Sequence, residues 1–118
     1  MKRQQPTPPF IRIPQAAYNS PAFQSLRPIE VAVLLLLASK FNGHNNGNVP
    51  LGLTEATRRC HCSKSTAHRA LARLQETGLI AMTYRGHMVP EIGRPDAPTR
   101  WRIAFLENIH ERHLHVVS

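Results

Sequence analysis

Residues 60–79 read C-H-C-S-K-S-T-A-H-R-A-L-A-R-L-Q-E-T-G-L, and this stretch decides the fold. Four apolar residues recur at helical spacing and predict one buried face, namely Ala67, Ala70, Leu71 and Leu74. Ser63 is a favoured N-cap residue, and Gly78 is the residue type that most often follows a helix end, where a Schellman motif can close the last turn. The stretch therefore predicts a helix over residues 64–77 with a polar and basic outer face.

Two helices are expected before this stretch. Pro28 and the apolar run that follows it predict a helix over residues 28–41, which is apolar on all sides. Such a helix needs cover on several sides, and residues 10–26 or a second subunit are the two candidates. Thr54 is expected to cap a short helix that ends near Arg59.

Two strands are expected after the stretch. Residues 79–84 and 99–105 alternate between apolar and polar types, so each strand predicts one buried face, with Met82 and Tyr84 in the first and Trp101 and Phe105 in the second. A platform on which single-stranded bases stack is the alternative for these four side chains. Residues 85–98 between them are rich in proline and predict a long loop, since long loops are usually functional. The predicted order is therefore a helix, a short helix, a turn, a third helix and a two-stranded ribbon. This is the order of a winged helix-turn-helix, a mainly α fold with a small β hairpin (α+β).

This fold predicts where DNA would be contacted, because its third helix fits the major groove and reads bases with its N-terminal residues. Base contacts are expected from Lys64, Ser65 and His68. Backbone contacts are expected from Arg58, Arg59, Thr66, Arg69 and Arg73. In the wing, the expected contacts to the minor groove or its phosphates come from Arg85, His87, Arg94 and Arg100.

Composition points to the same partner. The 118 residues carry a net charge of +8 and a sequence pI of about 10.8, and most of the basic residues are arginine. Residues 58–102 hold nine basic and three acidic side chains, so most of the excess falls on the second helix end, the third helix and the wing. A basic surface concentrated in this way favours a polyanion, and arginine favours double-stranded DNA.

Other classes of protein are disfavoured by the sequence. The longest apolar run, residues 31–38, is far too short to span a membrane, and no secretory signal is visible. Cys60 and Cys62, separated by His61, lack the spaced pairs of a zinc site, so no metal and no cofactor are expected. No enzyme motif is present, which predicts a non-enzymatic protein of the cytoplasm, associated with the nucleoid.

The sequence also resembles a known group of proteins. The stretch S-K-S-T-A-H-R-A-L-A-R-L-Q-E-T-G-L-I is similar to the recognition helix and strand start of bacterial winged-helix regulators of the GntR type. A wider pattern over residues 10–105, including N-G-H-N-N-G and T-R-W-R-I, resembles small helix-turn-helix proteins of phages, plasmids and integrative elements. The resemblance implies a DNA-binding regulator or replication accessory factor without a ligand domain. Arg27 departs from it, because relatives tend to carry a serine cap there.

The sequence thus predicts three segments: a mobile, basic and proline-rich arm over residues 1–9, the winged helix-turn-helix domain over residues 10–105, and a tail or short helix over residues 106–118. The predicted function is sequence-specific binding of double-stranded DNA, as a homodimer on a palindromic site. A replication-initiation accessory module and a winged-helix module that binds another protein are the alternatives.

Overall fold

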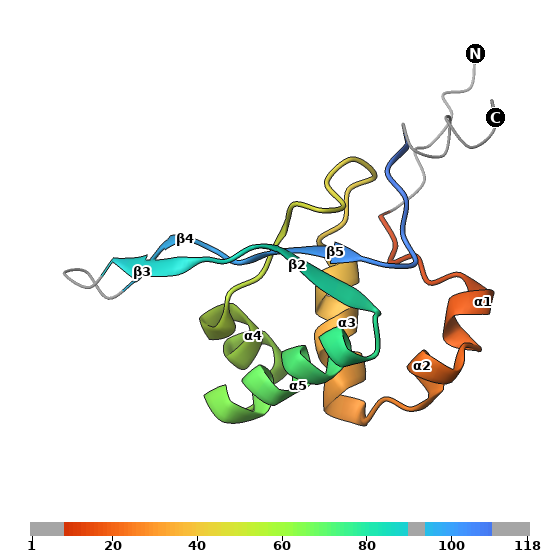
Figure 1. Cartoon of the computed structure of the whole chain (residues 1–118), viewed down its shortest axis with the longest axis horizontal. Coiled ribbons are helices and arrows are strands. Elements are labelled where there is room, and N and C mark those ends of the chain that lie inside the picture. The colour runs from red at the N-terminus through yellow and green to blue at the C-terminus, as the bar shows by residue number, and fades with distance from the viewer. Residues whose placement is uncertain (1–8, 90–93, 110–118) are drawn as a thin grey trace, which may run out of the picture.

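The computed structural model describes residues 9–89 and 94–109, and it shows a winged helix-turn-helix fold (Figure 1). Helices lie on one side of a small antiparallel sheet, and a narrow ribbon extends beyond the sheet (Figure 1). The helices are α1 (Gln15–Tyr18), α2 (Pro21–Gln24), α3 (Pro28–Ser39), α4 (Leu53–Cys60) and α5 (Lys64–Glu76). The strands are β1 (Val49–Pro50), β2 (Ile80–Tyr84), β3 (His87–Val89), β4 (Arg94–Ala97) and β5 (Arg100–Ile103).

The sheet has the order β1-β5-β2, and both pairs are antiparallel. Ile80 pairs with Ile103 and Met82 pairs with Trp101, but a β-bulge between Met82 and Tyr84 shifts the register beyond that point. The strands β3 and β4 pair with each other in a separate two-stranded sheet. Residues 85–98, which were expected to form a loop, therefore contain two strands that continue the hairpin outward as the wing (Figure 1).

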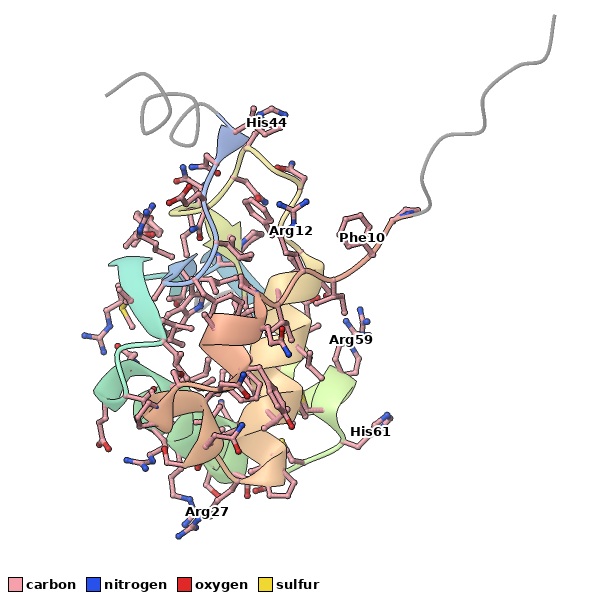
Figure 2. The ribbon with its side chains drawn as sticks, turned by 90° about the vertical axis from the view of Figure 1, so that its right-hand side faces the viewer. Phe10, Arg12, Arg27, His44, Arg59 and His61 are labelled. Carbon is pink, nitrogen blue, oxygen red and sulfur yellow. The ribbon has the colours of Figure 1, made fainter. Side chains whose placement is uncertain are left out.

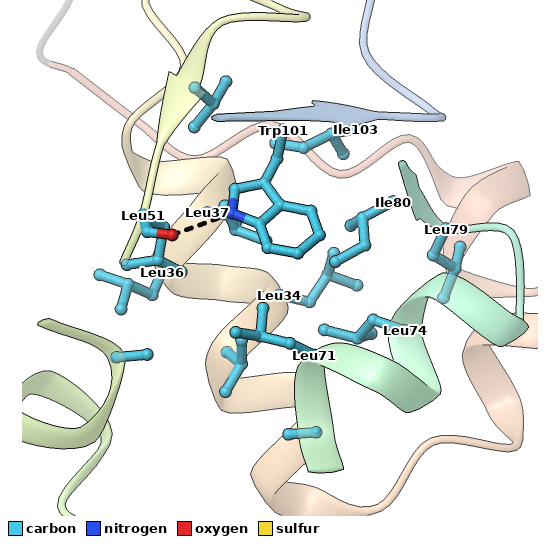
Figure 3. Close-up of a cluster of buried hydrophobic side chains, with 14 of the residues drawn as sticks. Leu34, Leu36, Leu37, Leu51, Leu71, Leu74, Leu79, Ile80, Trp101 and Ile103 are labelled. Atoms are coloured by element: carbon cyan, nitrogen blue, oxygen red, sulfur yellow. Dashed lines mark hydrogen bonds between the residues drawn. The ribbon is translucent and has the colours of Figure 1, made fainter. Parts of the chain in front are cut away.

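The core lies where α3, α5 and the sheet meet (Figure 3). Trp101 is almost fully buried there, and its indole N–H donates to the Leu51 carbonyl at 3.0 Å. Full burial of each large apolar side chain contributes about 1.5–3 kcal/mol. The largest fully buried side chains are Leu34, Leu37, Leu51, Leu74, Ile103, Leu106, Val33 and Val49.

The apolar helix α3 is covered within this chain. Val33 and Leu37 are fully buried, and Phe23 of α2 belongs to the same core cluster. Ile13 and Leu26 from the same N-terminal segment pack against that cluster. Of the two candidates for covering the helix, the segment 10–26 is therefore the one that the structure places there.

The starts of α3 and α4 depart from the simplest capping pattern. The buried Glu30 carboxylate accepts a hydrogen bond from the Arg27 backbone N–H at 2.9 Å, so the first turn of α3 is closed although position 27 lacks a serine. The N-cap of α4 is Gly52, so the prediction that Thr54 caps this helix is wrong. The half-buried Leu53 packs against the core and is the first residue of the helix, which therefore begins two residues earlier than predicted.

Most of the predicted arm and tail, residues 1–8 and 110–118, lies outside the described residues. At the C-terminal side, Leu106 is buried in the core, whereas Ile109 is exposed. Among the helices that the structure describes, none is long and apolar enough to cross a membrane.

Candidate nucleic-acid interface

The helix α5 has a defined start and end. The Ser63 hydroxyl oxygen accepts a hydrogen bond from the Thr66 backbone N–H at 3.1 Å, which confirms Ser63 as the N-cap. At the other end Gly78 has a φ of +81°, its N–H donates to the Gln75 carbonyl at 3.0 Å, and the Leu79 N–H donates to the Leu74 carbonyl at 3.2 Å. These two bonds form the predicted Schellman motif. Both ends of α5 are therefore closed by local hydrogen bonds.

The predicted contact residues of α5 point in three directions around the helix. Ser65 and Arg69 are exposed and lie one turn apart on the side opposite the buried face. His68 faces the sheet side, where it lines a cleft. Arg73 faces α2, where its guanidinium donates to the Ser25 hydroxyl at 3.4 Å. Lys64 is exposed at the first position of the helix.

Arg73 is restrained by two surface contacts. Besides Ser25, its guanidinium lies 3.8 Å from the Glu76 carboxylate, and both side chains of this ion pair are well exposed. Such exposed pairs contribute little to stability, so this one mainly limits the positions of the guanidinium. The charge is thereby held at the flank of α5 that faces α2.

The turn between α4 and α5 carries further basic residues. Arg58 and Arg59 are exposed in the last turn of α4. His61 ends this helix in the left-handed conformation with a φ of 54°, and the Cys62 N–H donates to the Thr57 carbonyl at 3.2 Å. Arg59 and His61 project outward from this end of α4 (Figure 2). The positive side chains of α4 thus lie next to the start of α5.

The two cysteines of this turn are free and half-buried. Burial raises the pKa of the Cys60 thiol above its ordinary value, Cys62 adds to the rise, and Arg59 opposes it. Among the described residues, no group of three or more histidine, cysteine or acidic side chains is placed to hold a metal ion. The turn connects α4 to α5.

A cleft of about 200 Å³ separates α5 from the base of the wing. His68 and Gln75 line it from α5, Met82 lines it from β2, and Arg85 lines it from the segment after β2. The structure thus brings His68 and Arg85 together. Met82 is 43% exposed, so the prediction that it belongs to the core is wrong.

Arg100 lies on the other face of the sheet. It precedes the buried Trp101 on β5, and neighbouring side chains of a strand point to opposite faces. Because of the bulge, Tyr84 pairs with Arg100, and the guanidinium lies 5.5 Å from the centre of its ring. Tyr84 is 42% exposed, so its predicted burial is wrong as well. His87 and Arg94 lie on β3 and β4, and their side chains are outside the described part of the chain.

Residues 31–82 match the family described as the IclR helix-turn-helix domain. The match runs from α3 through α5 into β2 and covers less than half of the 118 residues. Neither the search of curated proteins nor the search of solved structures found a match. The family match and the fold together support a helix-turn-helix protein that binds double-stranded DNA sequence-specifically. The resemblance to GntR-type regulators is not confirmed by this match and stays a prediction.

Sequence reasoning missed two parts of this surface. Met82 and Gln75 line the cleft between α5 and the wing, and Ser25, which follows the last residue of α2, accepts a hydrogen bond from Arg73. The strict alternation along β2 predicted a buried Met82, because alternation cannot tell a closed core from an open cleft. Nothing local to Ser25 indicated its contact, which joins residues 48 positions apart.

Proposed function

We propose that this protein is a transcriptional regulator of a phage, plasmid or integrative element, acting in the cytoplasm on the nucleoid. The observation that carries the DNA-binding part of the proposal is α5, a capped helix with an apolar inner face, an outer face that exposes Ser65 and Arg69, and an exposed His68 on the side toward the sheet. The mobile-element part rests on the sequence resemblance. A helix of this kind fits the major groove, where each base pair presents a distinct pattern of donors and acceptors. The match to a helix-turn-helix domain also favours DNA binding.

The proposed contacts divide by position. Base edges are assigned to the residues in the first turns of α5, namely Lys64, Ser65 and His68. Phosphates are assigned to the residues around them: Arg58, Arg59, Thr66, Arg69 and Arg73. The wing is assigned the adjacent minor groove or its phosphates through Arg85, His87, Arg94 and Arg100. The exposure of Arg58, Arg59, Arg69 and Arg85 supports this division, because phosphate contacts need charges that DNA can reach.

We further propose that two copies bind a palindromic site, since helix-turn-helix dimers bind half-sites about one helical turn apart. Phe10 is 65% exposed and Tyr18 is 52% exposed, and large exposed apolar side chains favour contacts between proteins. Sedimentation of the chain alone and of the variant F10S/Y18S measures this association. A wild-type chain that remains monomeric both free and on DNA would contradict the proposed dimer.

Selection of bound duplexes from a random-sequence pool tests the proposed DNA reading. A recurring motif is expected, and a palindromic motif supports the dimer. Recovery of unrelated sequences would contradict sequence-specific reading. Chromatin immunoprecipitation with sequencing then tests the role in transcription, because a regulator is expected at promoters. Binding confined to a replication origin would support the replication accessory alternative, and capture of a stoichiometric protein partner without DNA would support the interaction module.

A further inference from the structure

The cleft between α5 and the base of the wing combines apolar and cationic chemistry. Met82 and Trp101 line it from the sheet, His68 and Gln75 line it from α5, and Arg85 lines it from the wing side. Its volume of about 200 Å³ is below the roughly 300–1,000 Å³ that small-molecule sites usually have. The cleft is therefore too small for a typical drug-sized effector and suits a narrower group.

We infer that this cleft receives the sugar–phosphate backbone of one strand of double-stranded DNA, with Met82 against a deoxyribose and Arg85 on a phosphate. The inference rests on the proposed function and adds to it a contact between Met82 and the backbone of the duplex. A deoxyribose presents C–H groups and carries an anionic phosphate beside them. A half-exposed methionine next to an exposed arginine matches both parts of that unit.

The position of the cleft supports the same occupant. It joins two surfaces that are assigned to DNA, because His68 belongs to α5 and Arg85 belongs to the wing. A strand that runs from the groove occupied by α5 to the wing passes across this cleft. The wing is also fixed at this point, since the Gly86 N–H donates to the Thr99 hydroxyl oxygen at 3.1 Å.

The neighbouring residue of the same strand provides a matched control. Met82 lines the cleft, whereas Ala81 is exposed and pairs with Arg102, on the face of the sheet that points away from α5. Met82→Asp and Ala81→Asp add the same charge at adjacent positions. We expect Met82→Asp to weaken binding to a selected duplex at least about tenfold, because the new carboxylate repels a phosphate at close range, and Ala81→Asp to weaken it less than about threefold.

Lysine at the same two positions adds a positive charge, so the expected change in affinity has the opposite sign. This second test does not require the fold to accommodate a carboxylate on β2. Met82→Lys is expected to tighten binding more than Ala81→Lys and to steepen the dependence of affinity on salt by about one unit of logarithmic slope. Thermal melts show whether each variant is folded. Equal effects at positions 81 and 82 in folded variants, with either charge, would overturn the inference. The same holds if Met82→Asp weakens binding only to single-stranded DNA.

Duplex binding by the wild-type chain distinguishes a failure of the proposed function from a failure of the inference about the cleft. If it binds no duplex, the proposed function fails. If it binds a selected duplex tightly and the paired variants at positions 81 and 82 behave alike, only the occupant of the cleft is wrong.

Discussion

The backbone of Asn46 and the side chain of Asn108 exchange two hydrogen bonds. The Asn46 N–H donates to the Asn108 Oδ1 at 2.8 Å, and the Asn108 Nδ2 donates to the Asn46 carbonyl at 3.1 Å. The Asn46 side chain donates to the carbonyls of Ile103 and Leu106 and accepts from the Ile103 N–H. Both asparagines are buried, at 5% and 4% exposure. This pair fastens the loop of residues 42–48 to the end of β5.

Asn46→Ala is therefore expected to lower the free energy of unfolding by about 3 kcal/mol, because it leaves a buried N–H and two carbonyls without their partner. Urea denaturation followed by the fluorescence of Trp101, the single tryptophan, measures this loss. His44→Ala in the same loop is the control, since the His44 side chain is exposed (Figure 2). A loss for Asn46→Ala no larger than for His44→Ala would contradict a structural role of the asparagine pair.

The contrast between this pair and α5 shows what the sequence can predict. Ser63 and Gly78 act on backbone groups a few residues away, so both ends of α5 could be predicted from the local sequence. Asn46 instead bonds residues 57 to 62 positions further along the chain, and its neighbourhood indicated only a loop. Tyr84 was misplaced for a similar reason, because the bulge that turns it arises from pairing with β5.

Gly78→Ala is expected to destabilise the fold by roughly 1–2 kcal/mol. The glycine has a φ of +81°, which L-residues rarely adopt, whereas no atom lies within 4 Å of the Cβ that would be added. The cost therefore comes from the backbone and not from a clash. Gly78→Asn is the matched variant, because asparagine tolerates this conformation better and should cost less. Thermal or urea unfolding compares the two, and equal costs would contradict this account of the helix end.

Ser63→Ala is expected to lower the free energy of unfolding by about 1 kcal/mol, because it removes the N-cap of α5. Ser65→Ala is the control for stability, since Ser65 is exposed, accepts no hydrogen bond from the helix backbone and only lies 3.3 Å from the Ser63 hydroxyl, and it should stay within about 0.5 kcal/mol of the wild type. Urea denaturation measures both variants. A similar loss for the two serines would argue against a capping role for Ser63.

His68 and Arg73 test the proposed division between base and backbone contacts. Arg73→Ala is expected to weaken binding about equally on all duplexes and to reduce the salt slope by about 1, because a phosphate contact carries no sequence information. His68→Ala is expected to change the base preference at one position of the site. Titrations on a panel of single-base variants of a selected duplex measure both effects. Identical profiles for the two variants would contradict the assigned roles.

The candidate site could be predicted in part. The exposed residues of α5 follow from helical spacing alone, because the buried positions of that helix were visible as an apolar repeat. The meeting of His68 and Arg85 at one cleft could not be predicted, since it depends on how β2 packs beside α5. The place of Arg100 beside Tyr84 could not be predicted either, because it depends on the bulge in β2.

The proposed function depends on the reading of double-stranded DNA sequence by α5. This reading is measured by titrating the wild-type chain with a selected duplex and with a scrambled duplex of equal composition, at several salt concentrations. We predict that the selected duplex binds about a thousandfold more tightly, and that both affinities fall steeply as salt rises. Equal affinity for the two duplexes would contradict sequence reading by α5, and affinities that do not change with salt would contradict the phosphate contacts around it.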